Sequence, residues 1–299
     1  MKKITALLLS LSVVMIFTGC SFIGSKDPTQ IIIGGKNFSE QDILVYMMQY
    51  VIEDQTSLKV KTKPFLGGTS VVSQAIERGD IDIYPEYTGT ALINILGEPP
   101  IDDPQAAFNK VKALYKEQKN IVWLDPFGFN NTYTLTMRND EAERLGIVTI
   151  SDLASKSSTL RLGCTHEFLE RDDGEKGLEA KYGLKFAATS GMEPGLTYVA
   201  VNDSKVDVID GFSTDGRIIA FNLRVLKDDK QFFPPYYAAP IIRADILQQH
   251  PEIATALKLL AGKIDDQEMT KLNAKVDLEK QDAKIVAKEW LISKGLIKG

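Results

Sequence analysis

The sequence predicts an α/β fold of two lobes, with a hinge and a ligand-binding cleft between them. The chain has 299 residues, of which 44% are hydrophobic, so it is long enough to bury two cores. Two series of alternating strand-like and helix-like patterns follow one another along it. Proline-containing stretches at 124–132 and 234–239 mark two crossings between these series. Two crossings would form a hinge that can close around a ligand.

The first series predicts a parallel sheet with right-handed crossovers, because strands and helices alternate with short connections. Strands are expected at 31–33, 58–64, 81–84 and 121–123, and helices at about 39–54, 69–76, 91–96 and 104–118. Ser39 is a candidate cap for the first helix. Pro85 is expected to end the third strand, since proline lacks the N–H that a strand ladder uses. Tyr87 would then lie just beyond a strand end, where open α/β sheets bind ligands.

The second series begins with a strand pattern rich in β-formers at 130–137. Further strands are expected at 160–164, 185–186, 206–210 and 223–226, with helices at 167–182 and 193–202. Beyond the double proline at 234–235 the pattern is mainly helical, around 251–260 and at 282–293. We expect this helical tail to pack on the first lobe.

The N-terminus has the pattern of an export signal. Two lysines precede an apolar run at 4–17, which is too short for a permanent membrane span, and small residues lead into Cys20. This ending resembles a bacterial lipobox, which implies removal of residues 1–19 and lipidation of the Cys20 thiol. The alternative is an ordinary signal peptide cleaved elsewhere. Residues 20–29, mostly small and polar, are interpreted as a tether.

Charge and cysteine content exclude several classes of function. Loss of the two N-terminal lysines would move the net charge from -5 to -7, so nothing favours nucleic acid as a partner. If Cys20 carries lipid, Cys164 is the one remaining cysteine and no intramolecular disulfide can form. We interpret Cys164 as a small buried residue at a strand end rather than a nucleophile.

Six short stretches, in a fixed order, carry a resemblance to a known family. They are GGKNFSEQ at 34–41, GGT at 67–69, GDIDIYPEYTGT at 79–90, NNTY at 130–133, FSTDG at 212–216 and FPPY at 233–236. In these stretches the chain resembles the substrate-binding lipoprotein of bacterial osmoprotectant ABC transporters. That family captures glycine betaine, carnitine, choline and related quaternary ammonium compounds.

The resemblance implies a two-lobed fold of the type II periplasmic-binding-protein class. Lobe 1 would comprise 30–131 and 237–299, and lobe 2 would comprise 132–236. It also implies a monomeric, lipid-anchored receptor outside the cytoplasmic membrane that catalyses no reaction and needs no cofactor or metal. Its partners would be the quaternary ammonium ligand and a membrane permease driven by a cytoplasmic ATPase.

The family's ligands need an aromatic cage. A trimethylammonium group has no N–H to donate, so it is held by the faces of aromatic rings. By motif position, the rings that the resemblance implies here are those of Tyr87, Tyr133, Phe212 and Tyr236. Phe212 stands where resembling members usually carry tyrosine, so the ring face is kept and the phenolic group is lost.

A betaine also carries a carboxylate, which needs fixed donors. Arg171 occupies the place where related betaine binders have a carboxylate-binding arginine, and its planar fork suits two oxygens. Lys36 matches a polar ligand contact in some members, and Thr90 could add a hydroxyl. The alternative for Arg171 is an ion pair with Glu167 or Asp172, and for Lys36 a solvated surface position. A ligand with a carboxylate is favoured over choline.

Other readings of the charged residues are weaker. Asp80, Asp82 and Glu86 could suggest acid–base catalysis, but strand-end turns and solvated faces explain them more simply. His166 and His250 lack companions at a metal-binding spacing. The alternatives that stay open are the same scaffold specific for carnitine, choline or ergothioneine, and an extracytoplasmic enzyme on a related scaffold.

Overall fold

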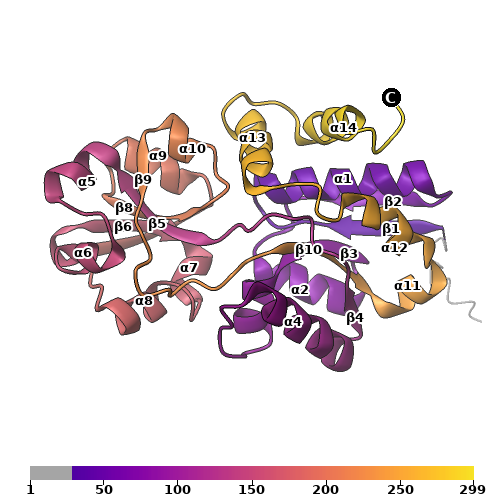
Figure 1. Ribbon diagram of the computed structural model, residues 1–299, viewed down its shortest axis with the longest axis horizontal. Coiled ribbons are helices and arrows are strands. Elements are labelled where there is room, and N and C mark those ends of the chain that lie inside the picture. The colour runs from indigo at the N-terminus through magenta and orange to yellow at the C-terminus, as the bar shows by residue number, and fades with distance from the viewer. Residues whose placement is uncertain (1–28) are drawn as a thin grey trace, which may run out of the picture.

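The computed structural model describes residues 29–299, so the expected signal segment, Cys20 and nearly all of the expected tether lie outside the described residues. Within this range the chain forms two five-stranded sheets with helices around them, side by side along the long axis (Figure 1). This confirms the prediction of a two-lobed α/β fold. We call the part built on the first sheet lobe 1 and the part built on the second sheet lobe 2.

Lobe 1 is built on a mixed sheet. Its strands are β1 (Gln30–Gly34), β2 (Lys59–Lys63), β3 (Ile83–Tyr87), β4 (Ile121–Trp123) and β10 (Ala238–Arg243). They lie in the order β2-β1-β3-β10-β4. As predicted, β1 runs parallel to β2 and β3, whereas β10 is antiparallel to both of its neighbours. A strand from near the end of the chain therefore lies inside a sheet that begins at the start of the described residues.

The helices of lobe 1 come from both ends of the chain. They are α1 (Ser39–Gln55), α2 (Thr69–Arg78), α3 (Thr88–Thr90), the π-helix η1 (Ala91–Ile95), α4 (Pro104–Lys119), α11 (Ala244–Gln249), α12 (Glu252–Leu257), the 3₁₀ turn η3 (Lys258–Leu260), α13 (Asp266–Asp277) and α14 (Ala283–Ser293). α12, α13 and α14 all contact α1, which confirms that the helical tail packs on lobe 1. No helix within residues 29–299 combines the length and apolar character needed to cross a membrane.

The start of α1 differs from the prediction. Phe38 occupies the N-cap position, and Ser39 is already the first helical residue. The Ser39 hydroxyl donates to Asp277 Oδ1 on α13 at 2.6 Å instead of capping the helix. The residue before the helix thus places an aromatic ring, not a hydroxyl, at the helix start.

Lobe 2 is built from the middle of the chain. Its strands are β5 (Tyr133–Arg138), β6 (Arg161–Thr165), β7 (Ala188–Met192), β8 (Val208–Phe212) and β9 (Leu223–Val225), in the order β7-β6-β8-β5-β9. Its helices are α5 (Asn139–Leu145), α6 (Ile150–Ala154), the 3₁₀ turn η2 (Ser157–Thr159), α7 (His166–Glu170), α8 (Glu175–Tyr182), α9 (Leu196–Asn202) and α10 (Arg217–Ala220). Cys164 on β6 is fully buried, as expected.

The strand expected at 185–186 is wrong. The edge strand of lobe 2 is β7, which begins three residues later and pairs with β6 alone. Its first three residues, at 188–190, are exposed and mostly small, so the segment lacks the apolar alternation that identifies a half-buried strand. The backbone ladder rather than a hydrophobic face defines this strand.

Pro85 does not end the third strand, so that prediction is also wrong. β3 continues to Tyr87, with Pro85 opposite Pro240 of β10. The Pro85 carbonyl accepts from the Gln41 amide at 3.0 Å, and the Pro240 carbonyl accepts from Leu124 N–H at 3.0 Å. Both carbonyls therefore accept hydrogen bonds from outside the β3–β10 pair. This is the pattern of a non-hydrogen-bonded position in an antiparallel ladder. Because residues at such a position exchange no N–H···O bonds with each other, two facing prolines remove no hydrogen bond from the ladder.

The chain crosses between the lobes twice. It leaves lobe 1 after β4 and returns just before β10, along two neighbouring backbone segments (Figure 1). Asn130 forms an isolated antiparallel bridge with Tyr237, and Asn131 N–H donates to the Tyr236 carbonyl at 3.1 Å. Both crossings thus run beside each other at the junction of the lobes, next to the pocket described below.

Candidate functional site

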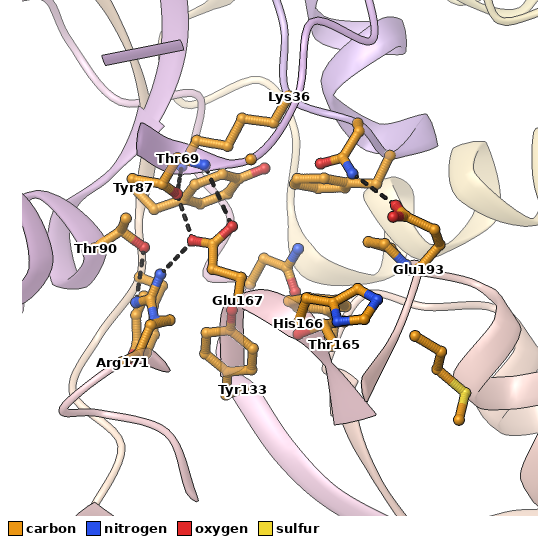
Figure 2. A pocket seen from close by; sticks show the side chains of 18 residues that line it. Lys36, Thr69, Tyr87, Thr90, Tyr133, Thr165, His166, Glu167, Arg171 and Glu193 are labelled. Carbon is orange, nitrogen blue, oxygen red and sulfur yellow. Dashed lines mark hydrogen bonds and ion pairs between the residues drawn. The ribbon is translucent and has the colours of Figure 1, made fainter. Parts of the chain in front are cut away.

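The main candidate site is a pocket of about 220 Å³ between the two lobes. Ligand pockets for drug-sized molecules usually start at about 300 Å³, so this one suits a small solute. All seven residues singled out in the sequence line it: Lys36, Tyr87, Thr90, Tyr133, Arg171, Phe212 and Tyr236. Figure 2 shows several of them converging from both lobes.

Strand ends bring the lining side chains together. Lys36 follows β1, and Tyr87 is the last residue of β3 in the same sheet. In lobe 2, β5 runs antiparallel to β8, so the first residue of β5, Tyr133, pairs with the last residue of β8, Phe212. Tyr236 arrives on the return crossing, two residues before β10. The sheets therefore point these residues at the cleft, as open α/β sheets do with their ligand sites.

The rings form one continuous aromatic wall. Tyr133 lies with its ring centroid 5.0 Å from that of Phe212 and 5.8 Å from that of Tyr236. Phe38, the N-cap residue of α1, stacks on Phe212 at 5.8 Å and on Tyr87 at 6.3 Å. Phe38 therefore joins the rings of the two lobes, although the sequence analysis did not assign it to the site. Its position just after β1, within the matched GGKNF stretch, could have indicated that Phe38 belongs to the site.

Buried carboxyl groups hold two of the tyrosines by their hydroxyls. Tyr87 donates to Glu40 Oε1 at 2.7 Å, and Tyr236 donates to Asp173 Oδ2 at 2.5 Å. Burial, together with these nearby carboxylates, raises the pKa of both tyrosines well above the usual value, so they stay neutral donors. Donation to a carboxylate polarises the phenol and makes its ring face more negative, which favours cation binding.

Glu40 is the most connected acceptor behind the pocket. It receives hydrogen bonds from Tyr87, from Asn131 on the outgoing crossing, from Thr214 in lobe 2 and from Asn273 on α13, at 2.6–2.9 Å. Burial raises the pKa of its carboxyl, and these four hydrogen bonds oppose that rise. Glu40 thereby joins lobe 1, lobe 2 and a crossing segment through one side chain.

Lys36 is buried and already paired, not solvated. Its Nζ lies 2.6 Å from Glu86 Oε1, donates to Thr69 Oγ1 at 2.9 Å, and stands 5.3 Å from the centre of the Tyr87 ring. Glu86 also accepts from Tyr84 and is fully buried. The ammonium group is thus fixed beside the first ring of the wall.

Arg171 lies where the chain breaks between two helices. The sequence predicted one helix over 167–182, but α7 ends at Glu170 and Arg171 has an extended backbone. Its guanidinium forms a two-point contact with Asp173 at 2.6 and 2.8 Å, and Nη2 also donates to Thr90 at 3.2 Å. It stands 5.0 Å from the centre of the Tyr133 ring. The buried Arg171 guanidinium therefore contacts Asp173, Thr90 and the Tyr133 ring, and its remaining nitrogen, Nη1, faces a further acceptor.

That further acceptor is Glu167, which the sequence analysis considered only as a partner of Arg171. Its Oε1 accepts from Arg171 Nη1 at 2.8 Å and from Thr69 Oγ1 at 2.5 Å, and its Oε2 accepts from Thr69 N–H at 3.2 Å (Figure 2). Burial disfavours its charge, but the Lys36 and Arg171 charges and the Thr69 hydrogen bonds outweigh that effect. The pKa of Glu167 lies below its usual value.

Nine further residues line the pocket without having been predicted as ligand contacts, although four of them lie in the matched stretches at 34–41, 67–69 and 130–133. They are Asn37, Gly68, Thr69, Asn131, Thr165, His166, Met192, Glu193 and Pro194. Asn37 in lobe 1 donates to Glu193 in lobe 2 at 3.1 Å, which closes the far side of the pocket. The contact between Asn37 and Glu193 depends on how the two lobes meet, so the sequence alone could not predict it.

Comparison with known proteins places the chain among solute-binding proteins. Residues 29–293 match the family described as the substrate binding domain of ABC-type glycine betaine transport system. The carnitine transport binding protein OpuCC of Listeria monocytogenes is 38% identical over 304 residues, covering 100% of this chain and 99% of the relative. A glycine-betaine-binding protein of Pseudomonas aeruginosa is 40% identical over 272 residues, covering 87% of this chain and 86% of the relative.

A solved structure agrees with these relatives. It is described as a crystal structure of a glycine betaine/carnitine/choline ABC transporter and is 37% identical to this chain. The superposition has a TM-score of 0.73 and covers 90% of this chain and 100% of the other. The similarity therefore spans both lobes and the pocket between them.

Proposed function

Because the chain belongs to the family of substrate-binding domains of ABC-type glycine betaine transport systems, we propose that its pocket captures a quaternary ammonium zwitterion such as glycine betaine. Membership makes it the extracytoplasmic component that binds a small molecule for a membrane permease. The identity of that molecule is the proposal. Capture without chemical change is part of it, since a receptor releases its ligand intact.

The continuous aromatic wall is the observation that carries this proposal. Each desolvated contact between a cation and a ring contributes up to about 2 kcal/mol. Four rings at that value would supply the roughly 8 kcal/mol of a micromolar complex. Phe38 adds a ring to the proposed cage of Tyr87, Tyr133, Phe212 and Tyr236 and stacks on two of its members.

Buried cations support a carboxylate on the ligand. Lys36, Arg171 and Thr90 lie on one side of the pocket, and we assign them to the ligand's carboxylate. Arg171 would use its Nη1 edge, because its other nitrogens contact Asp173 and Thr90. Because Arg171 Nη1 donates to Glu167, the ligand's carboxylate must either share this donor with Glu167 or displace Glu167 from it.

Carnitine is a second candidate ligand. The relative that aligns over the whole chain is named a carnitine transport binding protein. Carnitine carries the same trimethylammonium and carboxylate groups as glycine betaine, on a longer and hydroxylated chain. Phe212 in place of a tyrosine removes one hydroxyl from the wall and so changes the space and polarity available to such a ligand.

Calorimetric titration of the soluble body, from about Lys26 onward, tests the proposal. Glycine betaine, carnitine, choline and ergothioneine are compared in one buffer. Saturable binding of glycine betaine or carnitine is expected, with recovery of the ligand unchanged by mass spectrometry. Binding of none of the four, or turnover of any of them, contradicts the proposal.

Membrane attachment through Cys20 is a separate part of the proposal. In the full-length chain expressed in its bacterial host, we expect a lipidated protein that partitions into detergent. Cys20→Ala should shift it to the aqueous phase without altering the ligand affinity of the body. Equal partitioning of both forms would contradict a lipid at this position. We expect the soluble body to be monomeric by light scattering.

A further inference from the structure

The carboxylate of Glu167 reaches across the cleft from lobe 2 to lobe 1. It accepts both the N–H and the hydroxyl of Thr69, the first residue of α2. The N-cap residue of that helix is Gly68, which has no side chain to cap it. A helix N-terminus attracts anions because its first N–H groups lack intrahelical partners. Glu167 therefore supplies from the other lobe the anion that α2 lacks.

The groups around Glu167 are those that a ligand's carboxylate would use. Arg171 Nη1 donates to it at 2.8 Å, and Lys36 is linked to it through the shared Thr69 hydroxyl. A Cβ added to Gly68 would lie 3.0 Å from Glu167 Oε2, so the glycine leaves space for this close approach. Lysine, arginine, a hydroxyl and a helix N-terminus together form an anion subsite in which the protein's own carboxylate sits.

Two fully enclosed carboxyls of this region, those of Glu86 and Asp173, are held more tightly than that of Glu167. Glu86 is fully buried between Lys36, Tyr84 and its own neighbours. Asp173 is 3% exposed and is bound by Arg171, Tyr236 and Asn94. The Glu167 side chain is 31% exposed and lines the pocket, so it is the least enclosed of the three. Among these three carboxyls, Glu167 is the one that a ligand can displace.

We propose that Glu167 is a specificity-determining residue, an internal anion that competes with the carboxylate of a zwitterionic ligand and favours ligands that carry only the cation. This rests on the proposed function. A ligand carboxylate can take Thr69 and the Nη1 edge of Arg171 only when Glu167 moves, since two carboxylates in one subsite repel each other. A ligand without a carboxylate leaves Glu167 in place and gains a nearby negative charge for its ammonium group.

Glu167→Gln tests this because it removes the charge and keeps the size. We expect the affinity for glycine betaine to rise and that for choline to fall, each by about threefold or more, so that their ratio changes by about tenfold. Glu170→Gln is the matched control, since it removes a carboxylate from the same helix at a position that does not line the pocket. That control should leave the ratio within about twofold of the wild type.

The outcomes separate the inference from the function it rests on. A wild-type protein that binds neither ligand contradicts both. A wild-type protein that binds, with a ratio that is unchanged or reversed in Glu167→Gln, overturns the role of Glu167 and leaves the proposed function intact. Melting temperatures verify folding. If Glu167→Gln does not fold, Glu167→Ala replaces it, because alanine also removes the charge and should shift the ratio in the same direction.

Discussion

Tyr133 carries two contacts that a ligand would have to share. Its ring lies 5.0 Å from the Arg171 guanidinium carbon on one side and 5.0 Å from the centre of Phe212 on another. A protein cation on a ring that also serves a ligand cation keeps that ring oriented. In the proposed cage, the ring rather than the hydroxyl is therefore the part of Tyr133 that would hold the ligand.

Substitutions at Tyr133 can separate ring from hydroxyl. Tyr133→Phe should bind ligand within about twofold of the wild type, because it keeps the face that attracts the cation. Tyr133→Ala should weaken binding roughly 30-fold, which corresponds to about 2 kcal/mol. Calorimetric titration of both variants measures the difference. Equal affinities for the alanine and phenylalanine variants would remove Tyr133 from the cage.

Asp210 makes the stability of lobe 2 depend on pH. It is fully buried on β8 and accepts from Thr165 N–H and Oγ1 at 3.0 and 2.7 Å. Burial raises its pKa from 3.8 to about 7, against the pull of the Thr165 hydrogen bonds. Between these two pH values the folded state binds a proton that the unfolded state has released. Its contribution to the free energy of unfolding therefore falls as pH rises through this window.

Asp210→Asn removes that proton-binding site. The melting temperature of the wild type, taken relative to Asp210→Asn, should fall from pH 5 to pH 8, with a free-energy change of at most about 3 kcal/mol. Thermal melts of both proteins at several pH values measure the difference. A difference that stays constant or rises with pH would show that Asp210 is ionised in the folded state throughout this range.

Six of the seven lining residues named from the sequence belong to the short matched stretches, and Arg171 was named by its position alone; all seven line the pocket. The sequence could not predict Glu167 or Glu40 as central groups, because their partners come from distant segments. Glu167 binds Thr69, and Glu40 binds Thr214 and Asn273. The contacts with Thr69 and Thr214 exist only once the two lobes are assembled, and the contact with Asn273 only once the C-terminal helices pack on α1. Neither spacing nor composition encodes them locally.

At the scale of single elements, the break between α7 and α8 positions Arg171. Gly174 closes the turn by donating its N–H to the Arg171 carbonyl at 3.1 Å. A Cβ at Gly174 would lie 2.0 Å from the Phe168 carbonyl oxygen, a backbone atom that cannot move aside easily. The turn therefore requires glycine, and the position of the Arg171–Asp173 pair depends on it.

Gly174→Ala should destabilise the protein by about 1–3 kcal/mol and also weaken ligand binding, because the clash displaces Arg171. Gly183→Ala, at the other end of α8, is the control. Gly183 has φ +75° and open space around its Cβ position, so alanine there costs about 1 kcal/mol of stability and leaves the site unchanged. Melting temperatures and titrations compare them. Equal ligand affinity in both variants would show that the turn at Gly174 does not position Arg171 for ligand binding.

Elements with strong local patterns were predictable, and elements defined by long-range pairing were not. The branched run at 121–123 and the helix after Pro104 match β4 and α4 closely. β7 was missed because its exposed small residues depend on β6 for their structure. Pro85 was misjudged because its partner across the ladder, Pro240, lies far along the chain.

At the scale of the whole molecule, both tryptophans lie in lobe 1 and outside the pocket. Trp123 is buried in β4 and Trp290 on α14 donates to Glu268. Ligand binding in the wild type should therefore change tryptophan fluorescence by only a few per cent. Phe233→Trp, on the return crossing and next to Tyr133 with ring centroids 6.2 Å apart, should report binding by a larger signal. A large signal in the wild type would mean that lobe 1 itself rearranges.

The position of β10 inside the lobe 1 sheet has a consequence for the order of folding. Every strand of lobe 2 lies between β4 and β10 in the chain, so lobe 2 can form from one continuous segment. The lobe 1 sheet cannot join β3 to β4 until β10 has arrived, and closing that long loop is slow. During refolding, pulsed hydrogen exchange should protect β6 and β8 before β3 and β4. A chain emerging from a ribosome or a translocation channel would accordingly expose half a sheet until its last quarter appears.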